Sequence, residues 1–433
     1  MRLSRVIRTW WPLAASWLLM GVEQPVLSAV VARLPDARIH LAAYGGIVWP
    51  IALIIESPII MLLSASTALS KDWASYRKLW NYMMIAGGGL TVLHALVAFT
   101  PLYYGVVRGL LGVPEEIIEP ARVGLQIMLP WTWTIAYRRF NQGVMIRFGH
   151  SRSVGAGTVV RLLAGMSVLF AGLVLGTLPG VVVATLAVAV GVSSEALFAG
   201  RVVRPLLRNE LAAAPPVVPP LTYRAFFQFY LPLVLTSLLS LLAQPIGSAA
   251  LSRMPDALSS LAVWPVVTGL IFMVRSLGLA LNEVVVALLD EPGARPVLRQ
   301  FTIGLTVIAF GILLLLAATP LSQWWFEGVS ALPADLSSLA RTALWFGIPV
   351  PALIAMQSWY QGQLLHSRHT RAISDSVVIF LLVTAAILIA GVALGNTTGV
   401  FVGMVAMLVS TIAQTVWLGI QAHRDAALSG TPR

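Results

Sequence analysis

The sequence predicts an all-α polytopic membrane protein of about twelve transmembrane helices, built as two parallel six-helix repeats that form two lobes. Composition, a series of apolar segments of spanning length and an internal repeat support this prediction. Of the 433 residues, 58% are hydrophobic and only 10% are charged, whereas a soluble chain has about 25% charged residues. A soluble fold of this size could not bury so much apolar surface, whereas lipid accepts it on every helix exterior.

The apolar segments come in two sets of six, and each segment is at least as long as the roughly 20 residues that cross a hydrocarbon core. The first set lies near 10–32, 41–66, 79–101, 123–147, 154–177 and 180–204. The second lies near 225–251, 259–288, 300–320, 339–365, 372–394 and 398–421. The first segment follows three arginines, as in a signal peptide, but it has no small-residue cleavage site, so we expect a first span.

Prolines in the segment "NELAAAPPVVPP" interrupt the helical pattern between the two sets. We therefore expect an N-terminal six-helix lobe at 1–208, a cytoplasmic linker at 209–220 and a C-terminal six-helix lobe at 221–433.

The distribution of basic residues predicts the topology. A net charge of +11 would suggest a nucleic-acid partner in a soluble protein, but here the basic residues lie in short loops between spans. Only six of the 28 Lys and Arg residues fall in the presumed outer loops, namely Arg33, Arg38, Arg108, Arg122, Arg253 and Arg341. The positive-inside rule then places both termini in the cytoplasm, in a multi-pass protein of the inner (cytoplasmic) membrane with the lipid bilayer and not nucleic acid as its partner.

An internal repeat relates the two sets of spans. "PLAASWLLMGVEQPVLSAVVARLPDA" begins at Pro12, and "PLVLTSLLSLLAQPIGSAALSRMPDA" begins 220 positions later at Pro232. Later the offset becomes 219, so that Gln142-Gly143 matches Gln361-Gly362. Because each copy has an even number of spans, both copies enter the membrane from the same side and form a parallel repeat, which suits alternating access between two lobes.

Several segments resemble the multidrug/oligosaccharidyl-lipid/polysaccharide (MOP) exporter superfamily, and within it the progressive ankylosis protein and its bacterial relatives. They are "WWPLAASWLLMG" at 10–21, "LAAYGGIVWPIALIIESP" at 41–58, "LALNEVVVAL" at 279–288 and "WFGIPVPALIAMQSWYQGQLL" at 345–365. The resemblance implies a MATE-like, two-lobed alternating-access exporter. For the ankylosis-type branch it implies small anionic metabolites such as citrate, pyrophosphate or ATP.

Ionisable side chains inside spans are the candidate functional residues, because each costs roughly 2.5–3.5 kcal/mol on insertion. Glu23 and Gln24 precede Pro25, which frees a backbone carbonyl near the centre of the first span. A carboxylate beside such carbonyls could bind a coupling cation, a proton or the substrate, and a simple packing kink is the alternative.

Glu56 repeats this arrangement before Ser57-Pro58 in the second span. Two carboxylates in one apolar cavity, Glu23 and Glu56, would favour proton binding. The alternative is that Glu56 pairs with Arg138 or Arg139 and only holds helices together. These two arginines could bind an anionic substrate, although snorkelling toward the inner surface explains them equally well.

The second copy offers a different set of polar residues. Gln244 and Asn282 are candidate substrate contacts, as is Arg275. Glu283 lies eight residues after Arg275, on nearly the same helix face, and is a candidate for coupling. Glu195, near the inner end of its span, is expected to be structural.

We therefore predict a monomeric secondary transporter of a small anionic molecule, without a cofactor or metal, coupled to H⁺ or Na⁺. A lipid-linked-sugar flippase and a cation-coupled multidrug exporter remain alternatives with the same fold. No cysteine is present, which excludes thiolate metal sites. The sequence also lacks a hydrolase or metalloprotease motif, so we do not expect an enzyme.

Overall fold

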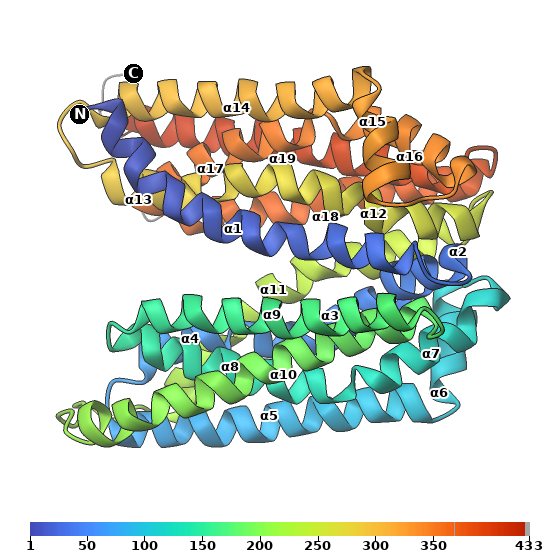
Figure 1. Cartoon of the computed structure of the whole chain (residues 1–433). Helices are drawn as coiled ribbons and strands as arrows, with labels where there is room; N and C mark the ends of the chain where they lie inside the picture. The colour runs from blue at the N-terminus through green and yellow to red at the C-terminus, as the bar shows by residue number, and fades with distance from the viewer. Residues whose placement is uncertain (368, 429–433) are drawn as a thin grey trace. The chain divides into compact units, whose positions relative to one another are not determined.

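The computed structural model describes residues 1–367 and 369–428, and every regular element in this part is a helix (Figure 1). Eleven of these helices are long and apolar enough to cross a membrane, and each overlaps one predicted span. The chain is therefore a multi-pass membrane protein. The predicted span at 123–147 is not among the eleven, and its part after Met128 carries Arg138, Arg139 and Arg147 within 19 residues.

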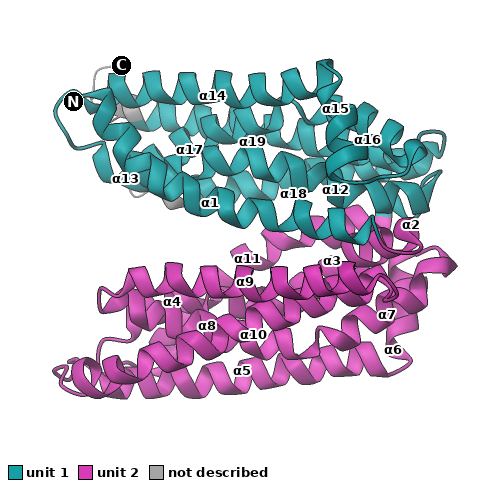
Figure 2. Cartoon of the chain, viewed as in Figure 1, with its two compact units in different colours: residues 1–33, 250–433 teal, residues 34–249 magenta. Residues whose placement is uncertain are grey.

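The chain forms two compact units (Figure 2). Unit 2 comprises residues Leu34–Ala249, and unit 1 comprises Met1–Arg33 together with Ala250–Arg433. These boundaries do not coincide with the two sequence copies at 1–208 and 221–433, because the first helix of each copy belongs to the unit formed mainly by the other copy.

Unit 2 contains thirteen elements from α2 to η4, followed by most of α11. They are α2 (Ala37–Leu41), η1 (Ala42–Val48), α3 (Trp49–Ile60), α4 (Leu62–Leu69), α5 (Trp73–Phe99), α6 (Leu102–Tyr104), η2 (Gly105–Leu111), η3 (Glu115–Ile117), α7 (Ile118–Ile127), α8 (Leu129–Arg147), α9 (Ser151–Leu175), α10 (Gly180–Leu206), η4 (Leu207–Leu211) and α11 (Tyr223–Leu251).

Unit 1 contains the first helix of the chain and the elements after α11. They are α1 (Leu3–Val31), α12 (Ala257–Leu279), α13 (Leu281–Leu288), α14 (Ala294–Ala318), α15 (Leu321–Gln323), η5 (Trp324–Val329), α16 (Ala334–Gly347), α17 (Val350–His366), α18 (Thr370–Leu394) and α19 (Gly399–Leu428).

Side-chain contacts explain why α1 belongs to unit 1. The Trp10 indole donates a hydrogen bond of 3.0 Å to the Leu277 carbonyl on α12. Gly21 allows the same two helices to approach, since a Cβ there would lie 3.2 Å from the Met273 Cα. The exchanged position of α1 is therefore fixed by its packing along α12.

Aromatic packing fixes α11 in unit 2 in the same way. Tyr82 of α5 has edge-to-face contacts with Phe226 and Tyr230 of α11, with centroids 4.8 and 5.2 Å apart. The Tyr230 hydroxyl also donates a hydrogen bond of 2.5 Å to the Pro58 carbonyl. That carbonyl lies where α3 ends and the backbone departs from helical geometry at Met61, so Tyr230 satisfies an acceptor that the helix break leaves available.

The backbone repeats its irregularities between the two copies. Asp36 and Asp256 adopt the left-handed conformation, with φ of 52° and 55°, just before α2 and α12. Gly176 and Gly395 end α9 and α18 in that conformation, with φ of 65° and 60°. A glycine accepts this conformation without a Cβ clash, which explains the matched helix ends.

The matched glycines Gly143 and Gly362 serve close helix packing. A Cβ at Gly143 of α8 would overlap the Leu63 carbonyl oxygen of α4. A Cβ at Gly362 of α17 would lie 2.6 Å from the Val285 Cβ of α13. In each unit the short helix after the break therefore rests against a glycine.

Candidate functional site

A buried polar cluster lies among α8, α9 and α10 of unit 2, with Glu195 at its centre. The Glu195 side chain is fully buried. Arg138 Nη1 donates to its Oε2 at 2.5 Å, and Gln142 Nε2 donates to its Oε1 at 2.9 Å. Arg161 Nε lies 3.7 Å from the same Oε2. Arg138 and Gln142 reach one carboxylate because residues four apart lie on the same face of a helix.

Glu56 of α3 and Arg139 of α8 extend this cluster. The charges acting on Glu56 are those of Arg139 and then Arg138. Glu56 is only 3% exposed, and its Oε2 atom has no hydrogen-bond partner in the described part of the chain. The Nε atoms of both arginines are likewise buried and unpartnered among the described residues.

Adjacent helix positions point about 100° apart, and the two arginines differ in their contacts. Arg138 forms an ion pair with Glu195, whereas the carboxylates whose charges act on Arg139 are Glu56 and then Glu195. With Arg161 included, three guanidinium groups face two carboxylates, so the cluster has an excess of positive charge. This arrangement can attract a small anion.

The repeat positions of Arg138 and Glu195 in unit 1 carry neutral side chains. Gln357 occupies the repeat position of Arg138 and donates to the Thr411 carbonyl at 3.1 Å and to Thr415 Oγ1 at 3.0 Å. Gln414 occupies the repeat position of Glu195 and donates to Ser376 Oγ at 3.3 Å. The charged network is therefore specific to unit 2.

Arg275 of α12 is the buried cation that unit 1 adds. Its guanidinium carbon lies 5.1 Å from the Phe272 ring centroid, and its Nε has no hydrogen-bond partner in the described residues. Asn282 Oδ1, just beyond the break between α12 and α13, is also buried and unpartnered there. The neighbouring Glu283 is exposed. Arg275 and Asn282 therefore keep unused hydrogen-bonding capacity on consecutive helices.

The remaining predicted residues lie on α1 and α11, the two helices that belong to the unit formed mainly by the other copy. Glu23 and Gln24 are partly buried on α1 in unit 1, and Gly269 of α12 faces Gln24. Gln244 is exposed on α11 in unit 2. Because Glu23 belongs to unit 1 and Glu56 to unit 2, the structure does not bring the two carboxylates together within one compact unit.

Arg161 is the member of the cluster that the sequence analysis did not select. It lies inside α9, within a span of mean hydropathy 2.1. An arginine inside such a span is itself a signal of a buried partner. Its ion pair with Glu195 joins α9 to α10 and supports the structural role expected for that glutamate.

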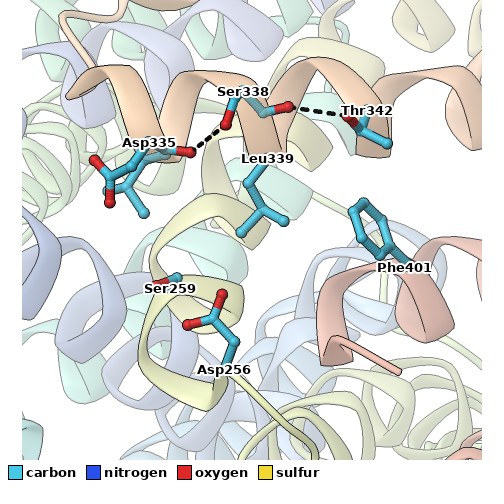
Figure 3. A pocket seen from close by; sticks show the side chains of 8 residues that line it. Asp256, Ser259, Asp335, Ser338, Leu339, Thr342 and Phe401 are labelled. Carbon is cyan, nitrogen blue, oxygen red and sulfur yellow. Dashed lines mark hydrogen bonds between the residues drawn. The ribbon is translucent and has the colours of Figure 1, made fainter. Parts of the chain in front are cut away.

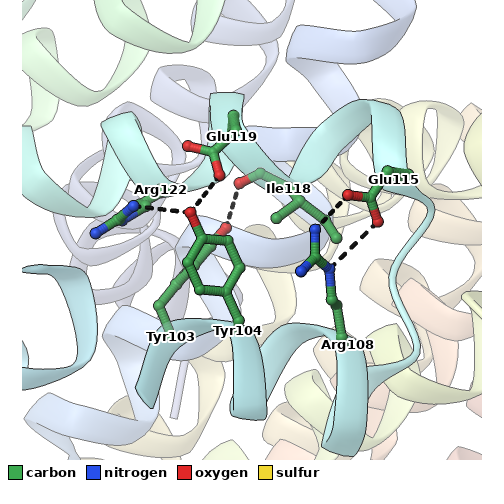
Figure 4. Close-up of polar contacts among 7 residues, drawn as sticks. All are labelled: Tyr103, Tyr104, Arg108, Glu115, Ile118, Glu119 and Arg122. Carbon is green, nitrogen blue, oxygen red and sulfur yellow. Dashed lines mark hydrogen bonds and ion pairs between the residues drawn. The ribbon is translucent and has the colours of Figure 1, made fainter. Parts of the chain in front are cut away.

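A second polar cluster lies outside the spans, between η2 and α7 (Figure 4). Arg108 pairs with Glu115, and the Tyr104 hydroxyl donates to Glu119 at 2.6 Å and accepts from Arg122 at 2.8 Å. The hydrogen bond to Glu119 raises the pKa of Tyr104. These contacts join consecutive loop segments and fix the connection between α5 and α7.

An open pocket of about 360 Å³ lies in unit 1 where α12, α16 and α19 begin (Figure 3). Asp256 and Asp335 line it together with Phe401. Both carboxylates lie at helix N-termini, where the helix dipole favours negative charge, so a structural role accounts for them. Among the described residues no group of three His, Cys, Asp or Glu could hold a metal ion.

Solved structures with this fold are transporters. A multidrug-resistance MATE family transporter of the MOP superfamily, in an inward-facing conformation, matches with a TM-score of 0.59 and 16% identity over 98% of this chain and 96% of its own. The lipid II flippase MurJ, in an inward closed conformation, matches with a TM-score of 0.61 and 13% identity over 94% of this chain and 88% of its own.

A third match carries information on binding-pocket charge. It is a MOP superfamily transporter from Pyrococcus furiosus Vc1, for which a reversed polarity of the binding pocket suggests a different function. It matches with a TM-score of 0.57 and 15% identity over 97% of this chain and 96% of its own. No protein-family model matches the chain, and no curated protein matches it. The likeness establishes the MATE-type fold, and these neighbours are transporters and not enzymes.

Proposed function

We propose that this chain is an alternating-access secondary transporter that exports a small anionic metabolite across the cytoplasmic membrane, as a monomer with both termini inside. The substrate class is that of citrate, pyrophosphate or a nucleotide. The fold shared with MOP-type transporters supports the transport mechanism. The buried side chains support the choice of an anion.

The observation that carries this choice is the excess of positive charge among the buried and half-buried side chains described in unit 2. In unit 2 Arg138, Arg139 and Arg161 outnumber the two carboxylates near them. A surplus guanidinium inside a membrane protein is costly unless an anion or another partner compensates it. Guanidinium groups bind carboxylates and phosphates bidentately, which suits these substrates.

Arg275 adds a buried cation in unit 1, where the repeat position in unit 2 carries Glu56. Its unpartnered Nε and the unpartnered Asn282 Oδ1 provide a donor and an acceptor for a polar ligand. Gln24 and Gln244 complete the candidate substrate contacts, and Glu23, Glu56 and Glu283 are the candidates for H⁺ or Na⁺ coupling.

The fold alone does not select a substrate, since structures that share it carry different functions. A lipid-linked flippase has specific support from the MurJ match and from the basic character of the cluster. A multidrug exporter is supported by the MATE match, but a cationic drug would favour an acidic site. The ankylosis-type resemblance favours the anionic metabolites.

Transport into proteoliposomes tests the proposal. The purified chain is reconstituted and given labelled citrate, pyrophosphate or ATP, or a cationic dye. We expect uptake of at least one anion, loss of that uptake in Arg139→Gln and Arg275→Gln, and normal uptake in the exposed control Arg341→Gln. Transport of the dye and none of the anions would contradict the proposal, and scrambling of a labelled lipid-linked sugar in its place would favour the flippase.

A further inference from the structure

We propose that Glu56 and Arg139 form one site in unit 2 that binds a proton and a small anion together, so that the two cross the membrane in the same direction. The inference rests on the anion transport proposed above and adds its coupling. Export then proceeds when the outward gradient of the anion exceeds the inward driving force on the proton.

The first step concerns which guanidinium group is available. Arg138 is held by Glu195 at 2.5 Å, within a network that also uses Gln142. Arg139 is partly exposed, and its buried Nε has no hydrogen-bond partner in the described part of the chain. Arg139 is therefore the cation of this cluster that can exchange one anionic partner for another.

The second step concerns the groups around Glu56. The helix α3 packs against α8, η1 and α5, and Tyr230 of α11 also reaches it through the Pro58 carbonyl. The charges that act on Glu56 come from Arg139 and Arg138 of α8. The other three elements carry ionisable side chains that add no charge at Glu56. These are Tyr44 on η1, Tyr76, Arg77, Lys78, Tyr82 and His94 on α5, and Tyr223, Arg224 and Tyr230 on α11.

The third step concerns competition for Arg139. A Glu56 carboxylate and an anionic ligand would both seek the same guanidinium group, and two anions in a buried site repel each other. Protonation of Glu56 removes this repulsion, and its Oε2, which has no hydrogen-bond partner among the described residues, can then donate a hydrogen bond to the ligand. The proton and the anion therefore favour each other's binding. Each also binds in the absence of the other, but with lower affinity.

The expected size of this effect follows from linkage. A coupling between two sites typically changes affinity by roughly 5–150-fold, and the effect is reciprocal. Acidification on the side of uptake should therefore raise the apparent affinity for the anion by roughly this factor. The anion should in turn increase proton binding to the same degree.

Proteoliposomes that contain the pH-sensitive dye pyranine test the inference, with labelled citrate, pyrophosphate and ATP each used in turn. In the wild-type chain an inward anion gradient should acidify the lumen. Glu56→Gln replaces the titratable acid with a permanently neutral amide, and its exchange of labelled for unlabelled anion is measured alongside lumen acidification. It should abolish lumen acidification and the effect of pH on apparent affinity.

Further variants keep the test decisive if Glu56→Gln folds poorly. Glu56→Asp retains a titratable group and should retain acidification, whereas Arg139→Gln should lose both exchange and acidification. Glu116→Gln, an exposed acid of the loop before α7, is the matched control and should behave as wild type.

The outcomes separate the two proposals. If the wild-type chain moves none of the three anions, the proposed function fails. If it moves an anion but Glu56→Gln still acidifies the lumen, or if Arg139→Gln still exchanges the anion, the transport proposal stands and the shared proton–anion site is refuted.

Discussion

Replacing Glu195 with alanine should destabilise unit 2 strongly, because one carboxylate accepts hydrogen bonds from two buried donors and forms a longer ion pair with a third group. In the wild-type chain Glu195 accepts from Arg138 at 2.5 Å and from Gln142 at 2.9 Å. The substitution would leave Arg138 as a buried charge without its partner and Gln142 without its acceptor. Breaking a buried ion pair by removing one partner costs about 3–5 kcal/mol. The unsatisfied amide adds about 1–3 kcal/mol, in part already included in that loss.

The repeat supplies a matched control at the same position of unit 1. Gln414 makes one hydrogen bond of 3.3 Å to Ser376 and carries no charge. Gln414→Ala should therefore cost only about 0.5–1.5 kcal/mol. Glu195→Gln should fall between the two alanine variants, because it keeps an acceptor for Arg138 but loses the charge.

Thermal unfolding in detergent, followed by intrinsic tryptophan fluorescence or by light scattering, measures the difference in stability between these variants. With about 2–4 °C for each kcal/mol in a unit of this size, Glu195→Ala should lower the apparent melting temperature by about 6–20 °C. Equal shifts of a few degrees in Glu195→Ala and Gln414→Ala would refute the reasoning, since Arg138 would then have relaxed to another partner at little cost.

Three further substitutions test other parts of the structure. Gly143→Ala should destabilise the protein by about 1–3 kcal/mol through overpacking against α4. Gly88→Ala, with open space around its Cβ position, should be neutral or stabilise the protein by about 0.5–1 kcal/mol. Equal melting temperatures of the two variants would contradict the close approach of α8 and α4. Asp72 caps α5 through Ser75 N at 2.9 Å and accepts from Val217 N at 2.9 Å. Burial raises the pKa of Asp72, but these hydrogen bonds outweigh burial and lower the pKa below the usual value. The Asp72 carboxylate therefore stabilises the fold fully above about pH 4, and this stabilisation is lost as the pH falls through the lowered pKa. Denaturation of wild type and Asp72→Asn should therefore differ at pH 6 and converge in acid, and a gap that widens in acid would reverse the sign. Arg275→Lys should weaken anion uptake at least about tenfold if bidentate binding matters, and an unchanged apparent affinity in the proteoliposome assay would exclude this role.

Much of the fold followed from the sequence because membrane spans are a local property. Apolar length alone identified eleven helices that the structure confirms. The repeat predicted two related sets of spans, and the structure places Gly176 and Gly395 at equivalent helix ends. Proline and glycine signals act within one helical turn, so they can be read without knowing the neighbours.

The candidate site was less predictable, because it depends on which helices are neighbours. The sequence offered Arg138 and Arg139 as an equivalent pair, and only the packing of α8 against α10 commits Arg138 to Glu195, 57 positions further along the chain. Arg161 entered the cluster for the same reason. A buried side chain's charge partner is set by side-chain direction across helices, which spacing within one helix cannot supply.

The sequence by itself determined the kind of protein: a chain of apolar spans, duplicated in parallel and unequal in its buried charges. The tertiary structure alone decided that α1 belongs with the helices of the second copy and α11 with those of the first. Lipid accepts any apolar helix, so hydrophobicity specifies that a span exists but not its neighbours. Close packing at Gly21 and the aromatic contacts of Tyr230 make that choice, and with it they assign Glu23 and Glu56 to different units.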